Sequence, residues 1–157
     1  GAGLLEHVPH RGWRVHPFRE EDMDDYLAVR EVLELMALDL ACPYIKRSEI
    51  VALLDSENHA LNNAIHLYII DKSGNRYIAD FFKQFVARYY TKLFYYAAPE
   101  ASVVDEMTSQ HQTLLETLLV EDWEKARKVL SHHIRAQKTV LEKLLVKDRG
   151  HINRRSK

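Results

Sequence analysis

Three histidines stand out in this sequence, because each falls on the apolar side of a different expected helix: His66, His111 and His133. A buried imidazole is tolerated only when both of its ring nitrogens have partners. Three such rings that meet in one core indicate a shared partner, and the simplest one is a metal ion. His111 and His133 lie on either side of an expected tight turn, so antiparallel helices would bring them side by side.

Asn62 precedes His66 by one helical turn, so both side chains project from the same face and can approach one ion. Imidazole suits Zn, Ni, Cu or Fe, whereas the amide oxygen of Asn62 is a weak, neutral fourth ligand. With neutral ligands the ion keeps its full positive charge and attracts a small carboxylate. Histidines on apolar faces also occur as hydrogen-bonded core residues, and spacing alone leaves both interpretations open.

Arg30 lies at the border of the apolar stripe of the first expected helix. Its guanidinium can bind the carboxylate of a ligand, or it can pair with Glu34 one turn further along. The sequence contains no glycine-rich phosphate loop, no Gly-x-Ser-x-Gly elbow and no His-Glu-x-x-His pair. No carboxylate is well placed as the general base of a hydrolytic zinc site. We therefore expect a binding domain and no enzyme, with a His-rich metal-dependent hydrolase on a helical bundle as the alternative.

The composition is that of one globular domain, with 46% hydrophobic and 29% charged residues among 157. A formal net charge of −1 argues against binding nucleic acid mainly by phosphate neutralisation. The single cysteine excludes an intrachain disulfide, and no apolar run approaches the roughly 18 residues that span a membrane. We expect a cytoplasmic protein that does not associate with membranes.

Apolar periodicity predicts a nearly all-helical fold, because the few glycines and prolines cluster where that periodicity breaks. Helices are expected at 20–42, 48–74 with a possible interruption at 55–58, 75–96, 102–120 and 122–146. Short connections favour antiparallel neighbours, so we expect an all-α, antiparallel bundle of about five to seven helices after a short irregular or β-ribbon segment. The stripe of the first helix that we expect to face the core comprises Tyr26, Val29, Leu33, Met36, Ala37 and Leu40.

Four stretches carry a recognisable order of motifs, and they cover about residues 20–146. They are Asp25–Glu34, Asn62–His66 followed by Ser73–Asn75, His111–Leu115 followed by Glu121–Ala126, and Leu130–Ile134. Together they resemble the FCD domain, the effector-binding domain of the FadR-type branch of GntR-family bacterial transcription regulators. Asn62 stands where that family has an acidic ligand, and the span between Ala41 and His66 is shorter than is usual there.

In that family, an acidic residue and three histidines bind a divalent metal inside an antiparallel helical bundle, and the metal helps to hold a small organic acid. The resemblance implies that Asn62, His66, His111 and His133 are the metal ligands here, with zinc or nickel as the expected metal. It also implies that Arg30 contacts the effector's carboxylate and that the domain forms a homodimer. A metal-free structural dimerisation bundle is the second alternative.

The resemblance extends to the first residues, which are similar to the end of a winged helix-turn-helix domain. We expect residues 1–18 to be a remnant of its wing and the linker, 19–147 the ligand-binding and dimerisation domain, and 148–157 a polar basic tail. The DNA-reading helices are not part of this sequence. DNA binding is therefore expected only through an N-terminal domain, and the chain is expected to be a fragment of a regulator.

Overall fold

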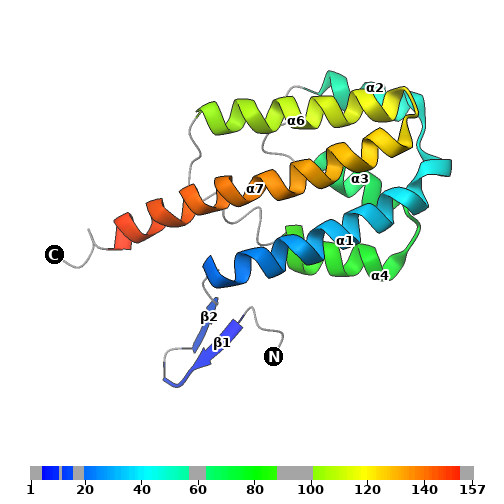
Figure 1. Cartoon of the computed structure of the whole chain (residues 1–157). Coiled ribbons are helices and arrows are strands. Elements are labelled where there is room, and N and C mark those ends of the chain that lie inside the picture. Colours follow the sequence, from blue (N-terminus) through cyan, green and yellow to red (C-terminus); the bar gives the residue numbers. More distant parts are fainter. Residues whose placement is uncertain (1–4, 11, 16–19, 57–62, 88–100, 153–157) are drawn as a thin grey trace.

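The computed structural model of the chain describes residues 5–10, 12–15, 20–56, 63–87 and 101–152. Most of this part is helical and forms an antiparallel bundle (Figure 1), which confirms the expected all-α fold. The helices are α1 (Met23–Ala41), α2 (Arg47–Asp55), α3 (Ala64–Lys72), α4 (Arg76–Phe81), α6 (Ala101–Leu119) and α7 (Trp123–Ile152). Two 3-10 turns, Glu20–Asp22 and Cys42–Tyr44, flank α1, and a π-helical segment, Phe82–Ala87, continues α4.

The expected β-ribbon is present at the amino-terminal end. β1 (Leu5–Val8) and β2 (Gly12–Val15) pair in an antiparallel register that places Leu5 opposite Val15. In Figure 1 the ribbon lies next to the beginning of α1, outside the bundle. Among the described residues, no helix is both long and apolar enough to cross a membrane.

The core lies between α1, α3, α6 and α7. Helix α1 packs against both α3 and α7, α7 packs against α6, and α2 covers α6. Because the packed faces are mostly apolar, burial of apolar surface drives this arrangement. Fully buried members of the core include Leu38, Ile50, Ile69, Ile70, Phe82, Leu114, Leu118, Leu130 and Ile134.

Most helix ends follow the local signals. α2 ends at Asp55, where Ser56 is extended, so the interruption expected near this point is present. Gly74 follows α3 with a φ of 66°, a left-handed conformation that glycine adopts without steric cost. α7 runs to Ile152, beyond the end expected near residue 146, and this stretch contains no proline that would end the helix.

The inner face expected for α1 was only partly right: Ala37 is buried, and Tyr26 and Leu33 pack partly buried against the core, as expected. Val29, Met36 and Leu40 are exposed, and α1 instead turns a face inward that includes two charged residues, Arg30 and Glu34. Because these charged residues interrupt the apolar periodicity of the buried face, the sequence pattern indicated a stripe that is rotated relative to the face that is buried. Helix α1 consequently has a second apolar surface, which we term the outer face of α1; it consists of Val29, Val32, Met36 and Leu40.

Asn75 provides a test of how α4 begins. Its Oδ1 accepts hydrogen bonds from the backbone N–H groups of Tyr77 and Ile78, both at 3.1 Å. Asn75→Ala should lower the free energy of unfolding by about 1 kcal/mol, because two N–H groups lose their acceptor. Asn75→Ser should retain most of that stability. Urea unfolding followed by circular dichroism measures both, and equal stability of all three proteins would contradict a capping role.

Candidate metal centre

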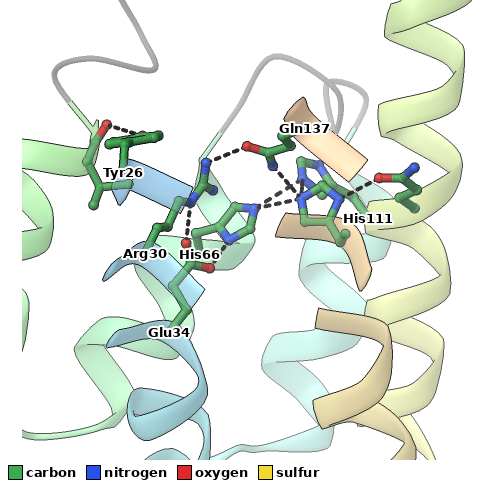
Figure 2. A network of polar contacts seen from close by, with 9 residues as sticks. Tyr26, Arg30, Glu34, His66, His111 and Gln137 are labelled. Atoms are coloured by element: carbon green, nitrogen blue, oxygen red, sulfur yellow. Dashed lines mark hydrogen bonds and ion pairs between the residues drawn. The ribbon is translucent and has the colours of Figure 1, made fainter. Parts of the chain in front are cut away.

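His66 of α3 and His111 of α6 meet inside the core (Figure 2), and His133 of α7 lies beside both of them. The Nε2 atom of His66 lies 3.2 Å from that of His111 and 3.1 Å from that of His133, and the latter two are 3.1 Å apart. All three side chains are buried. The structure thus brings three of the expected ligands to one point.

Apolar neighbours on each helix position these rings. His111 shares the inner face of α6 with Met107, Leu114 and Leu115, all of which are buried. The turn between α6 and α7 places Glu121 at a φ of 58°, and it is short enough to return α7 alongside α6. The tight turn predicted from the sequence is therefore what sets His133 beside His111.

The proton on His133 can be assigned from its partners. Its Nδ1 lies 2.7 Å from Oε1 of Gln110. Gln110 donates through Nε2 to the carboxylate of Glu106 at 3.3 Å, and a carboxylate only accepts, so the Gln110 oxygen must be the atom that faces His133. Nδ1 of His133 therefore carries the hydrogen and Nε2 carries a lone pair. Burial, reinforced by the neighbouring His66 and His111, lowers the pKa of His133 well below its usual 6.5, so this ring is neutral at pH 7.

His66 is oriented by a carboxylate. Its Nδ1 donates to Oε2 of Glu34 on α1, so its Nε2 turns toward the other two histidines. Burial by itself raises the pKa of Glu34, but the charge of Arg30 and the hydrogen bonds from Arg30 and His66 outweigh it and lower the pKa to about 2. Glu34 is accordingly ionised at neutral pH.

The three rings fit a divalent metal ion. The hydrogens of His66 and His133 are on Nδ1, so their Nε2 atoms, 3.1 Å apart, both carry lone pairs, and a cation beside them removes the repulsion between these. A triangle with sides of 3.1 and 3.2 Å has its corners about 1.8 Å from its centre. This distance is slightly shorter than a zinc–nitrogen bond of roughly 2.0–2.1 Å, so the three nitrogens are close enough together to share one ion. Three neutral nitrogens also suit zinc or nickel chemically. The three imidazole nitrogens and their spacing therefore fit a divalent metal ion.

Arg30 belongs to the same network and is completely buried. Its Nε donates to Oε1 of Glu34 at 2.5 Å, and its Nη1 donates to Oε1 of Gln137 at 2.5 Å. The amide nitrogen of Gln137 in turn lies 3.0 Å from Nε2 of His133. Figure 2 shows this chain of contacts running from α1 to the histidines. Of the two roles considered for Arg30, the pairing with Glu34 is the one seen directly.

Sequence reasoning did not find Gln110, Gln137 or the contact between Glu34 and His66. Gln137 follows His133 by one helical turn, and that spacing was the available signal. Asn62, the expected fourth ligand, lies outside the described residues. His132 is exposed, as expected for a residue adjacent to the inward His133.

A groove of about 320 Å³ lies between α6 and α7, on the outer side of the histidines. His133 and Gln110 form part of its wall, so the groove reaches the edge of the network. Within the described part of the chain, Glu34 is the carboxylate that contacts the histidines, and its commitment to Arg30 makes it a poor base. The arrangement favours binding over catalysis. The groove is lined by Ser109, Gln110, Thr113, Lys128, Val129, His132 and His133.

Comparison with known proteins agrees with this architecture. Residues 25–136 match the family model described as the FCD domain. The solved structure of E. coli McbR/YncC is similar with a TM-score of 0.75 and 22% sequence identity, over 88% of this chain and 77% of that chain. At this level of identity the likeness concerns the fold. No curated protein sequence matches this chain.

The buried pair of Arg30 and Glu34 can be tested against an exposed pair of the same helical spacing. Glu34→Gln should lower the free energy of unfolding by about 3–5 kcal/mol, because the buried guanidinium loses its counter-charge. Glu124→Gln, which removes the exposed partner of Lys128, should leave stability unchanged within error. Guanidinium chloride unfolding measures both. Equal losses in the two variants would contradict the role of burial.

Proposed function

This chain belongs to the FCD domain family, and we propose that it is the effector-sensing domain of a GntR/FadR-type transcription regulator. We assign a divalent metal, zinc or nickel, to His66, His111 and His133, and a small organic acid to the metal as the effector. The single observation that carries this proposal is the convergence of three buried imidazole Nε2 atoms, 3.1–3.2 Å apart, within the core of the bundle.

Each residue of the network has a proposed part. Glu34 and Gln110 hold the rings of His66 and His133 so that both Nε2 atoms face the ion. A bound metal supplies positive charge and open coordination positions, which a carboxylate can fill. Asn62, outside the described residues, is the proposed fourth ligand. Arg30 is the proposed contact for the carboxylate of the effector, which its guanidinium can hold through two hydrogen bonds.

Regulation requires that the effector bind one arrangement of the bundle more tightly than another. Helix α1 is suited to report this difference, since it carries Arg30 and follows the β-ribbon in the chain. We assign residues 1–18 to a wing remnant and linker, 19–147 to sensing and dimerisation, and 148–157 to a polar tail. DNA binding is assigned to a winged helix-turn-helix domain that precedes this sequence, in a regulator located in the cytoplasm.

The outer face of α1 supports the homodimer that the sequence predicts. Four apolar side chains at helical spacing are exposed there, and contiguous apolar surface of this kind commonly marks a protein interface. A face that repeats on a second copy can form a self-complementary contact around a two-fold axis. A second copy of this chain is therefore the proposed partner.

Metal binding is tested on protein stripped with a chelator. The stripped protein should take up one equivalent of Zn²⁺ or Ni²⁺, and at 100 times Kd the ion should add about 2.7 kcal/mol of stability. This gain corresponds to a rise of about 5–10 °C in Tm. Small carboxylates added to the metal-loaded protein should raise Tm further. Thermal unfolding and elemental analysis provide the measurements.

Adjacent histidines give a matched control for this experiment. His133→Ala should weaken Zn²⁺ binding at least 100-fold, because one of three nitrogen ligands is lost. His132→Ala removes the exposed neighbour and should leave Zn²⁺ affinity unchanged. If the original protein binds no metal and its Tm does not move, the metal-free structural bundle becomes the better interpretation.

The dimer is tested with two equally exposed valines. Val32 lies on the outer face of α1 and is 67% exposed, whereas Val120 follows α6 and is 69% exposed. Val32→Asp should convert a dimer to a monomer, since it buries an unpaired charge in the interface. Val120→Asp should remain dimeric. Light scattering after size exclusion gives the masses, and identical masses for the two variants would place the interface elsewhere.

A further inference from the structure

Gln137 lies between Arg30, to which the proposed function assigns the effector's carboxylate, and His133, to which it assigns the metal. Its side chain is buried, and both ends of its amide are engaged. Oε1 accepts from Nη1 of Arg30 at 2.5 Å, which fixes the orientation of the amide because a guanidinium only donates. The amide nitrogen therefore faces Nε2 of His133, at 3.0 Å, and donates to it.

The bond to His133 uses the lone pair that a metal would need. Gln110 accepts the hydrogen on Nδ1 of His133, so Nε2 has one lone pair and no hydrogen. A single sp² lone pair serves either a hydrogen bond or a metal bond. A metal ion on His133 must therefore break the hydrogen bond from Gln137.

The bond to Arg30 occupies the position that a carboxylate would take. Nη1 of Arg30 donates to a neutral amide oxygen, and a carboxylate is the stronger acceptor because its hydrogen bonds with a guanidinium are charge-assisted. Nε of the same guanidinium is held by Glu34. An incoming carboxylate that binds Arg30 at Nη1 consequently competes with Gln137 and leaves the pair with Glu34 intact.

We propose that Gln137 is an internal occupant of the ligand site, which the metal displaces from His133 and the effector's carboxylate displaces from Arg30. This inference rests on the proposed metal function. Gln137 lies on α7 and Arg30 on α1, and these helices pack against each other. Displacement thus removes one tie between α1 and α7 and makes the affinity of the site depend on Gln137.

The affinity for Zn²⁺ alone tests this role, because a supporting residue would change it in the opposite direction. Gln137→Met has a similar length and no amide. It should bind Zn²⁺ about tenfold more tightly, since no donor competes for His133. Loss of a partner that only orients a metal ligand typically weakens binding about 10–100-fold. Competition with a chromophoric chelator gives the dissociation constants.

A second pair of variants keeps the test decisive if Gln137→Met fails to fold. Gln137→Glu retains an acceptor for Arg30 and loses the donor to His133. Gln110→Glu adds the same charge on the opposite side of the same ring, where nothing competes for the metal. Gln137→Glu should therefore bind Zn²⁺ at least about tenfold more tightly than Gln110→Glu.

Failure of this inference is distinguishable from failure of the metal site. If the original protein binds Zn²⁺ but Gln137→Glu binds it no more tightly than Gln110→Glu, the role of Gln137 is overturned and the metal site stands. Weaker Zn²⁺ binding by folded Gln137→Met than by the original protein also overturns the role of Gln137 and leaves the metal site intact. If neither the original protein nor any variant binds Zn²⁺, both proposals are overturned.

Discussion

The buried carboxylate of Glu34 is the contact on which the rest of the site depends. A charge removed from water needs close partners, and Glu34 has two: the guanidinium of Arg30 supplies the opposite charge, and the imidazole of His66 donates a hydrogen bond. The first partner makes it possible for α1 to turn a charged face into the core. The second joins α1 to α3 and decides which nitrogen of His66 faces inward. The geometry of the histidines is thus set from α1, a helix that contributes no imidazole.

The same logic continues through two amides. Gln110 is oriented by Glu106, and Gln137 is oriented by Arg30, so each presents a defined atom to His133. Four helices, α1, α3, α6 and α7, consequently share one polar network inside an aliphatic core. In a low dielectric such a network is favourable only when its members find their partners together, and this requirement selects one packing of the helices over shifted ones.

The sequence predicted the helices and the meeting of three histidines because both depend on local periodicity and on short turns. It did not predict the rotation of α1, because the buried face contains two charged residues, Arg30 and Glu34. The exposed Val29, Met36 and Leu40 have the apolar spacing that is typical of a buried face. Nor did the sequence predict Gln110 or Gln137. The contacts of Gln110 with His133 and of Gln137 with Arg30 depend on which atoms of neighbouring helices come close together, and periodicity within one helix carries no information about such distances.

A bundle stabilised only by packing would gain from aliphatic side chains where the three rings meet, because well-packed apolar residues are often at least as stabilising as a buried polar cluster of similar volume. This chain instead uses a buried ion pair and the partly buried amide of Gln110 to orient His66 and His133, while the buried amide of Gln137 contacts Nε2 of His133. Such an arrangement becomes favourable when a cation completes it. It can also respond to a ligand, since Arg30 and His133 are both bound by Gln137, a neutral side chain that charged ligands can replace. The polar core is therefore better explained as a site than as a structural element.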